Sequence, residues 1–175
     1  DKILSEFESG LRMGYSWFYL VNTDLGAQGT DLGYTLPDLL EKMVKVKHVG
    51  NYSIVLDNIN PFFLKRQLPD LEEILAYGRI AALGSAVQSG SNRILQLVGR
   101  MHSAEQWKEC FLRVNRKFTN IRLQTHFMVG FPTETDEDFA ATLKHLDYPL
   151  LLDDIKIFKF SKRPTAYAGA DIRKD

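Results

Sequence analysis

Hydrogen-bonding side chains and glycines follow each of five short apolar runs, and they are the residues of this chain best suited to bind a small polar molecule. The set is Asn22, Thr23, Asp24 and Gly26; Asp57, Asn58 and Asn60; Gln88, Ser89, Gly90 and Ser91; Gly130 and Glu134; and Ser161, Lys162 and Arg163. Turns need Gly, Asn and Ser for conformational reasons, so one polar loop has an ordinary explanation. Five such loops in succession favour a site for a ligand with hydroxyl, carboxylate and ammonium groups.

Other catalytic and metal-binding patterns do not occur in the sequence. It contains no Ser/His/Asp or Cys/His arrangement, zinc-type spacing, Walker loop or G-x-G-x-x-G turn. The one cysteine, Cys110, shares a helical face with Trp107, Phe111 and Val114, which predicts a small core group and not a nucleophile. The histidines at 48, 102, 126 and 145 are scattered, and each is typical of a surface or packing residue.

The composition indicates a single globular domain spanning residues 1–175. Lys and Arg together number 22, as do Asp and Glu, so the net charge is zero and the overall field gives no argument for nucleic-acid binding. No apolar run approaches the roughly 20 residues that span a bilayer, and the opening residues DKILSEFESG lack a signal-peptide core. Because one cysteine excludes an internal disulfide, we expect a cytoplasmic protein without membrane association.

Strand-like and helix-like segments alternate along the chain. Strands are expected at 17–21, 52–56, 80–87, 121–129 and 155–160, and helices at 2–13, from Pro37, at 69–78, at 92–99, at 104–118 and after Thr135. This alternation, with near-continuous apolar strands, predicts a parallel α/β sheet. Ligands of such sheets bind beyond the carboxyl ends of the strands, where the polar loops lie. Periodicity does not distinguish an open doubly wound sheet from a barrel.

Two local expectations concern a turn and a helix face. Asn60-Pro61 is interpreted as a turn, so the helix that follows it is expected to begin at Pro69. In the last helix, Phe139, Leu143 and Leu146 recur at helical spacing and are expected to form its buried side.

Five strings of the sequence resemble segments of the radical SAM (S-adenosylmethionine) methylthiotransferases. They are AVQSGSNRIL at 86–95 with Gly99-Arg100 following, MVGFPTETDEDF at 128–139, IFKFSKRP at 157–164, TDLGAQGTD at 23–31, and Asn60-Pro61. The strings occur in the family's order, from about residue 6 to 168. Their collinearity makes the resemblance specific.

The resemblance implies a fold and two cofactors. The fold is a partial (β/α)6 TIM-like barrel, in which this chain is a truncated radical SAM core that supplies strands two to six. Such enzymes hold a [4Fe–4S] cluster through three thiolates of a Cys-x3-Cys-x2-Cys loop, and the open iron position takes SAM. That loop is absent from these residues and Cys110 does not replace it. We therefore expect the cluster only in a full-length protein, and the chain alone to be inactive.

The resemblance also implies which residues bind SAM. Gln88 stands at a ribose-binding position and Arg100 at one that pairs with the methionine carboxylate, which suits guanidinium geometry. Asn22 and Asp24 stand near the methionine ammonium group, and Asp24 is the better candidate on charge. The full implied set is Asn22, Asp24, Asn60, Gln88, Ser89, Arg100, His126, Met128, Gly130, Phe131, Ser161 and Arg163.

The adenine is expected to lie against the last two strand ends. Met128, Gly130 and Phe131 would flank it, and Gly130 would let the backbone approach closely. Ser161 and Arg163 would lie near the adenine or the substrate.

The sequence departs from the family's pattern at several positions. His126 stands where relatives commonly carry an Asp that contacts the ribose hydroxyls, and Thr133 replaces a Gly. These departures favour a divergent branch, in which radical SAM chemistry is more secure than methylthiolation.

The expected activity of the parent protein is reductive cleavage of SAM and insertion of a methylthio group into a tRNA base or a ribosomal-protein side chain. Two alternatives stay open: another radical SAM reaction, such as an oxidation or a methyl transfer, and a non-catalytic barrel that binds a nucleotide-like ligand or RNA. Strand 17–21 would also leave an unpaired sheet edge, so we expect dimerisation or low solubility unless the first helix covers that edge.

Overall fold

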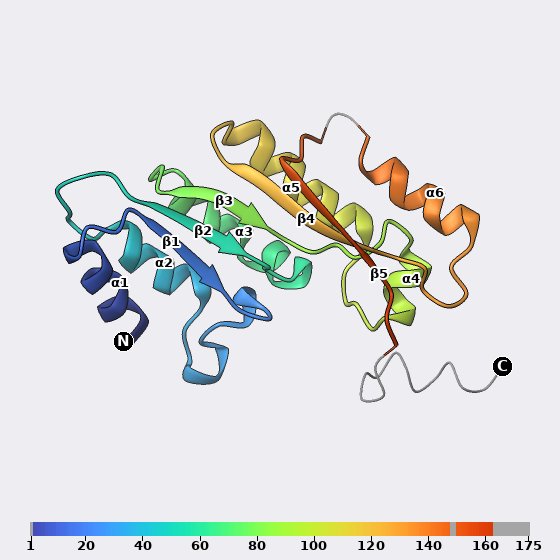
Figure 1. Cartoon of the computed structure of the whole chain (residues 1–175), viewed down its shortest axis with the longest axis horizontal. Helices are drawn as coiled ribbons and strands as arrows, with labels where there is room; N and C mark the ends of the chain where they lie inside the picture. Colours follow the sequence, from blue (N-terminus) through green and yellow to red (C-terminus); the bar gives the residue numbers. More distant parts are fainter. Residues whose placement is uncertain (1, 148–149, 163–175) are drawn as a thin grey trace.

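Five parallel strands form one sheet in chain order in the computed structural model, which describes residues 2–147 and 150–162 (Figure 1). The strands are β1 (Trp17–Val21), β2 (Ser53–Asp57), β3 (Ile80–Gly84), β4 (Arg122–Val129) and β5 (Asp154–Lys159). The helices are α1 (Lys2–Arg12), α2 (Leu36–Val44), α3 (Pro61–Leu75), α4 (Asn92–Leu97), α5 (Ala104–Lys117) and α6 (Asp136–His145), with short 3-10 turns η1 (Leu25–Ala27) and η2 (Thr30–Leu32). The predicted parallel α/β architecture is confirmed.

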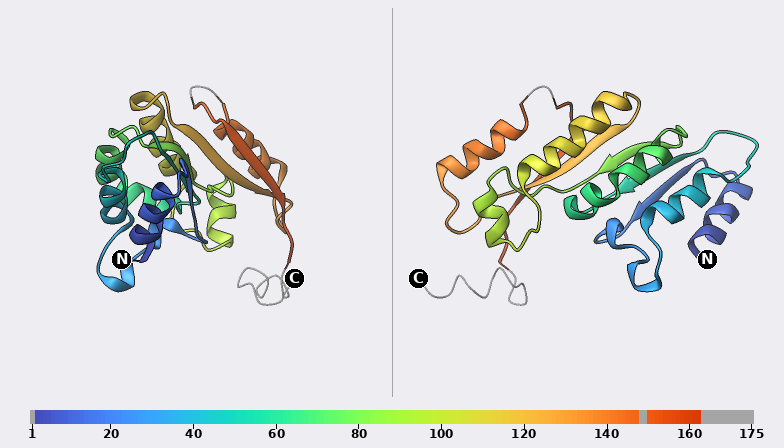
Figure 2. Two further views of the ribbon diagram at one scale, coloured as in Figure 1. Left: turned by 60° about the vertical axis from the view of Figure 1, so that its left-hand side comes forward. Right: turned by 180° about the vertical axis from the view of Figure 1, so that it is seen from behind.

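The helices cover one face of the sheet and leave the other face open, as the view from behind shows (Figure 2). In β1, Phe18 turns toward the helices and meets Phe7 of α1 at 4.5 Å between ring centroids. Tyr19, the next residue, points the opposite way and is 65% exposed. A curved single sheet with helices on one side is part of the wall of a (β/α) barrel, as the family resemblance implies.

Strand β3 is shorter than its predicted range of 80–87. Its ladder with β4 ends at Gly84, which pairs with Gln124, and pairing resumes only at Gln88, which forms an isolated bridge with Phe127. The apolar residues between them satisfy the sequence pattern of a strand although they leave the ladder.

Helix α3 begins at Pro61, so the expected start at Pro69 is wrong. The Asn60 side chain accepts a hydrogen bond from the Phe62 N–H (3.0 Å) and caps the helix. Pro61 occupies the first helical position, where its missing N–H costs nothing. Pro69 lies inside the helix. Asn60-Pro61 is therefore the start of a helix. Pro61 and Pro69 are both compatible with a first helical turn, so the sequence alone did not decide between them.

Helix α6 packs through polar residues, so its predicted apolar buried side is wrong. Phe139 is 43% and Leu143 50% exposed, and Leu146 is only partly buried, whereas Asp138 and Thr142 are buried. The physical reason is a set of buried hydrogen bonds that this face makes with the loop after β3. Polar pairs of this kind outweigh the apolar periodicity of a short helix.

Gly90 lets α6 approach that loop. A Cβ at position 90 would lie 2.5 Å from the Ala141 carbonyl oxygen, which is closer than real contacts allow. The Gly90 N–H donates to the Thr142 hydroxyl (2.9 Å), and no larger residue could make this contact without moving the helix.

Cys110 is a buried core residue, as the sequence predicts, and burial raises the pKa of its thiol to about 11. Within residues 2–147 and 150–162, no helix has the length and apolar character needed to cross a membrane.

Candidate functional site

The carboxyl ends of the strands meet along one edge of the sheet, and hydrogen bonds join each end to the next. These bonds run from Asn58 Nδ2 to Thr23 O (2.7 Å), from Ile59 N to Gly84 O (2.9 Å), from Met128 N to Gln88 O (2.7 Å) and from Phe160 N to Val129 O (2.8 Å). The loops at residues 22–28, 57–60, 85–91, 130–134 and 160–162 therefore form one continuous border, which we call the strand-end rim.

Asp24 joins the first two loops of the rim. Its Oδ1 accepts hydrogen bonds from the Gly26 N–H (2.9 Å) and from the Asn60 N–H (3.1 Å). The second carboxylate oxygen, Oδ2, makes no hydrogen bond with the residues that the structure describes, and the side chain is partly exposed. Asp24 is thus fixed in place with one oxygen left to bind a cationic group.

Asn22 and Asn60 serve this loop pair in different ways. The Asn22 Oδ1 accepts from the Thr23 N–H (2.7 Å), and its side chain is exposed at the end of β1. The Asn60 side chain caps α3, so its backbone N–H and not its side chain faces Asp24.

Gln88 has an unusual backbone conformation at the centre of the rim. Its φ is 76°, which only a few non-glycine residues adopt. The Gln88 N–H donates to the His126 carbonyl (3.0 Å), and the Gln88 carbonyl accepts from the Met128 N–H. Both bonds tie the strained residue to β4, and its side chain is partly exposed. Such strain is common where a side chain must be aimed at a ligand.

Arg100 follows α4, and it is the residue near the rim that argues most strongly for a ligand. Its guanidinium is partly buried, yet it forms no hydrogen bond or ion pair with any residue that the structure describes. Burial lowers the pKa of Arg100, and the negative charge of Asp24 opposes that shift. A partly buried cation without a partner is costly, and binding of a carboxylate would remove that cost.

Ser89 is fully buried and faces away from the open rim. Its hydroxyl lies 3.3 Å from the Thr142 hydroxyl of α6 and accepts from the Ser91 N–H (3.0 Å). Through these contacts Ser89 helps to hold α6 against the loop after β3. Its predicted contact with a cofactor stays a prediction.

His126 and Met128 lie on the open face of β4, two residues apart. The His126 ring meets Phe158 of β5 edge-on at 5.4 Å. Burial lowers the pKa of His126 and the neighbouring Lys156 lowers it further, while the carboxylates of Asp57 and Asp154 oppose this. A neutral imidazole can still exchange hydrogen bonds with hydroxyl groups, which an Asp at this position would also do.

The loop after β4 turns at Gly130, whose φ is 73°. The Glu134 side chain folds back to accept from the Gly130 N–H, and its other oxygen, Oε1, is buried without a hydrogen-bond partner among the described residues. Phe131 is 5% exposed and packs edge-on against Phe160 at 4.9 Å. The loop is therefore held by its own contacts and open at Gly130, where an added Cβ would meet no described atom within 4 Å.

The last part of the predicted site lies at the end of β5. Ser161 is exposed one residue beyond Phe160, at the border of the rim. Arg163 lies outside the described residues, so its predicted role stays a prediction.

His102 was missed by sequence reasoning and lies beneath the rim. It is 7% exposed, and its Nε2 lies 3.3 Å from the Val87 carbonyl oxygen. A single scattered histidine carries no signal of such a contact, although its position two residues after Arg100 could have drawn attention to it.

The two implied cofactors fit this chain unequally. Asp24 on the rim has a carboxylate oxygen without a hydrogen bond among the described residues, and Gln88 has an amide. Arg100, beside the rim, has a guanidinium without a partner among those residues. These groups are of the chemical types that could bind the ammonium, ribose and carboxylate groups of SAM. In contrast, the part of the chain that the structure describes contains no group of three or more His, Cys, Asp or Glu side chains that could hold a metal. The single cysteine of the 175 residues is buried, so these residues do not provide the thiolates of a [4Fe–4S] cluster.

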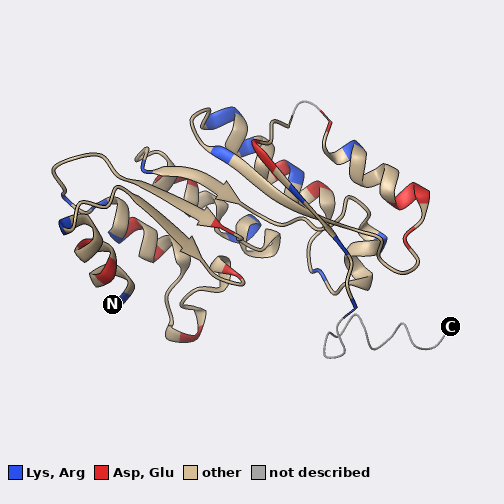
Figure 3. Cartoon of the chain, in the orientation of Figure 1, with Lys and Arg blue, Asp and Glu red and all other residues tan. Residues whose placement is uncertain are grey.

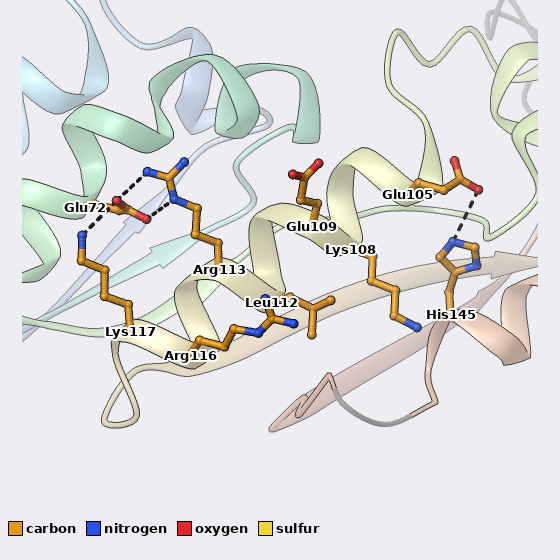
Figure 4. A pocket seen from close by; sticks show the side chains of 9 residues that line it. All are labelled: Glu72, Glu105, Lys108, Glu109, Leu112, Arg113, Arg116, Lys117 and His145. Carbon is orange, nitrogen blue, oxygen red and sulfur yellow. Dashed lines mark hydrogen bonds and ion pairs between the residues drawn. The ribbon is translucent and has the colours of Figure 1, made fainter.

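A cavity of about 580 Å³ lies on the outer helices, away from the rim (Figure 4). Glu72 of α3 binds both Arg113 and Lys117 of α5, and His145 of α6 lies 3.9 Å from Glu105. Charges of both signs are also distributed over the other helices (Figure 3). Because its charged groups largely satisfy one another, this cavity is a weaker candidate site than the rim.

Comparison with known proteins gives the family. The family described as the radical SAM superfamily matches residues 25–146. The solved structures of coproporphyrinogen III oxidase (HemN) from Escherichia coli and of the cobalamin-dependent radical enzyme OxsB share the fold. HemN has a TM-score of 0.61 at 20% identity, covering 99% of this chain and 41% of that one. OxsB has a TM-score of 0.65 at 14% identity, covering 95% and 24%.

Curated relatives are methylthiotransferases. A probable threonylcarbamoyladenosine tRNA methylthiotransferase of Archaeoglobus fulgidus is 36% identical over 141 residues, or 79% of this chain and 33% of the relative. MtaB of Aquifex aeolicus, with the same activity in its name, is 33% identical over 172 residues, or 97% and 40%. The ribosomal protein uS12 methylthiotransferase RimO of Thermodesulfovibrio yellowstonii is 31% identical over 167 residues, or 93% and 37%. The chain thus spans less than half the length of these relatives.

Proposed function

This chain belongs to the radical SAM superfamily, and we propose that its strand-end rim binds SAM for a methylthiotransferase that modifies a tRNA base or a ribosomal-protein side chain. The observation that carries this proposal is Arg100, a partly buried guanidinium without a partner among the described residues, which senses the charge of Asp24. The Arg100 cation near the rim and the Asp24 anion on it are complementary to an amino acid group, which carries both charges.

Each residue at or near the rim then has one role in binding SAM. Arg100 would bind the methionine carboxylate of SAM, and the free Oδ2 of Asp24 would accept from its ammonium group. Gln88, held in position by β4, would bind the ribose hydroxyls. Met128 and the open backbone at Gly130 would border the adenine. These interactions would hold the sulfonium group of SAM in a fixed position relative to the sheet.

A [4Fe–4S] cluster supplies the electron for reductive cleavage of SAM in this superfamily. The described residues of this chain do not fit such a cluster. The task of this chain is to bind and orient SAM.

The proposed substrates rest on what the relatives are named for. Threonylcarbamoyladenosine tRNA and ribosomal protein uS12 are the substrates in those names. Another radical SAM reaction is the second candidate, and it rests on the departures of the sequence from the resembled family's pattern, His126 among them.

Calorimetric titration of SAM into the 175-residue chain tests the binding proposal. We expect saturable binding, weakened at least tenfold in Gln88→Ala. Absence of binding to the folded chain, or unchanged affinity in Gln88→Ala, would contradict it.

The activity requires a second experiment on the full-length gene product. After anaerobic reconstitution with iron, sulfide and reductant, we expect SAM to be converted to 5′-deoxyadenosine. A methylthio group found on tRNA or on the ribosomal protein by mass spectrometry would identify the substrate. Release of 5′-deoxyadenosine without methylthiolation would favour the second candidate.

We also propose a cytoplasmic location, which is in keeping with the single cysteine.

We further propose that two copies of the chain associate through β1. β1 pairs only with β2 among the described strands, and its Trp17, Tyr19 and Val21 side chains are 57%, 65% and 70% exposed. Light scattering of the 175-residue chain is expected to show dimers, and a monodisperse monomer would contradict this.

A further inference from the structure

The chain leaves the sheet ladder between Gly84 and Gln88. Gly84 pairs with Gln124 and Gln88 with Phe127, so four steps along one chain match three along the other. The extra residue is a β-bulge, a feature that re-aims a side chain. The buried backbone carbonyls within the bulge lack strand partners and need other donors.

Side chains supply those donors. The Ser85 carbonyl accepts from the Trp107 indole N–H (3.1 Å) and the Thr125 hydroxyl (2.8 Å). The Val87 carbonyl, on a fully buried residue, has the His102 imidazole as its donor. This carbonyl belongs to the peptide bond that leads directly into Gln88.

The contact defines the state of His102. Because a carbonyl only accepts, Nε2 must carry the proton. Nδ1 is buried and has no partner among the described residues, so a second proton there would find no acceptor. Burial lowers the pKa of His102, and the nearby Arg100 cation adds to this, while the Val87 carbonyl opposes it. His102 is thus a neutral Nε2–H donor.

We propose that His102 is a positioning residue of the SAM site, which fixes the segment carrying Arg100 against the segment carrying Gln88. Other bonds hold these segments separately: the Arg100 N–H donates to Leu95 of α4 (2.8 Å), and the Gln88 N–H donates to His126 of β4. The bond from His102 to Val87 connects the two. The inference rests on the proposed function, since Arg100 and Gln88 are its two principal SAM ligands.

Two substitutions of His102 distinguish the effect of its hydrogen bond from the effect of its side-chain volume. His102→Leu keeps an apolar side chain of similar size but removes the donor, whereas His102→Gln places an amide N–H near the position of Nε2. We expect the dissociation constant for SAM to rise at least tenfold in His102→Leu, because small displacements of binding groups are costly. In His102→Gln it should stay within about threefold of the wild-type value.

His145→Leu is the matched control. His145 is also partly buried, and its Nδ1 lies 2.9 Å from the Ala141 carbonyl, but it lies on α6 away from the rim. Its loss should leave SAM affinity unchanged. If His102→Leu weakens binding no more than His145→Leu does at equal folded fraction, the positioning role is wrong.

A measurement without SAM keeps this inference distinct from the proposed function. If the wild-type chain binds no SAM, the proposed function fails, and NMR of the unliganded chain decides the inference. We expect the Arg100 Nε–H order parameter to fall in His102→Leu and to be retained in His102→Gln. Unchanged order in His102→Leu would overturn the proposal. So would a wild-type spectrum showing His102 as the Nδ1–H tautomer, a result that needs no variant to fold.

Discussion

Arg93 lies in the first turn of α4 and Arg100 three residues beyond its last residue, and their surroundings differ sharply. The Arg93 side chain is 46% exposed, yet it binds the buried carboxylate of Asp138 and the Thr133 carbonyl. Arg100 is more buried and its guanidinium binds none of the residues that the structure describes. Burial without pairing is the more expensive arrangement for a cation.

The difference indicates that the Arg93 charge supports the fold, and it supports the proposal that Arg100 binds a ligand. Asp138 also accepts from the Ser91 hydroxyl (2.5 Å) and the Thr135 N–H (3.0 Å), so the region around Arg93 is saturated with internal hydrogen bonds. It attaches α6 to the loop after β3. The Arg100 guanidinium, in contrast, has no hydrogen-bond partner among the described residues, and SAM is the molecule proposed to bind it.

The largest expected effect on folding comes from breaking the saturated region. Asp138→Asn removes the carboxylate that joins α4 to α6 and should lower the free energy of unfolding by about 2 kcal/mol. Chemical denaturation measures this, and SAM affinity of the folded protein should change less than threefold. A large loss of affinity at unchanged stability would reverse the roles assigned to the two regions.

Lowering the pH should remove the stability that the Asp138 carboxylate gives to the fold. Arg93, Ser91 and Thr135 hold the pKa of Asp138 below its usual range. A carboxyl whose pKa is lower in the folded state stabilises the fold above its unfolded pKa of about 3.9, and this is lost as pH falls further. The stability difference between wild type and Asp138→Asn should therefore be full at about pH 6 and shrink below about pH 4. A difference that grows toward low pH would refute the pairing.

Thr133, whose carbonyl binds Arg93, allows a test of the same region with a smaller expected effect on stability. It is β-branched with a φ of 71°, a conformation that suits glycine. Thr133→Gly keeps the carbonyl that binds Arg93 and relieves this strain, so thermal unfolding should report a gain of about 1 kcal/mol. A loss of stability would mean that the contact of the Thr133 hydroxyl with Arg93 (3.4 Å) matters more than the strain.

The smallest effect is expected at Arg100 in the absence of ligand. Arg100→Met removes a partly buried, unpaired charge and keeps an apolar chain of similar length, so stability should rise by about 0.5 kcal/mol. Denaturation of the unliganded protein measures this, with the exposed Arg116 of α5 as the matched control in Arg116→Met. Clear destabilisation by Arg100→Met alone would show that Arg100 supports the fold.

The sequence was sufficient for most features that depend on neighbours along the chain, although the local cap of α3 at Asn60-Pro61 was predicted to be a turn. Strands β1, β2, β4 and β5 lie within one or two residues of their predicted ranges, and Thr135 caps α6 as expected. Alternation of apolar runs and capping chemistry are local, so they can be inferred without the fold.

Features that depend on distant partners could not be inferred in this way. The polar face of α6 is buried because Gly90 and Ser91 bond to it from across the fold, and the apolar Phe139 is left outside. The contact of His102 with Val87 likewise exists only once the bulge after β3 has formed. The locations of Gln88 and Arg100 were available from the family resemblance, but the unpaired state of Arg100 required the structure.

Parallel calorimetric titration of SAM into Arg100→Ala and Arg93→Ala tests the central claim most directly. A charge-assisted contact with a carboxylate contributes about 2 kcal/mol, so Arg100→Ala should weaken binding about 30-fold. Arg93→Ala should bind within threefold of the wild-type protein once measured below its own unfolding transition. Equal losses in the two variants, or a larger loss in Arg93→Ala, would contradict the account.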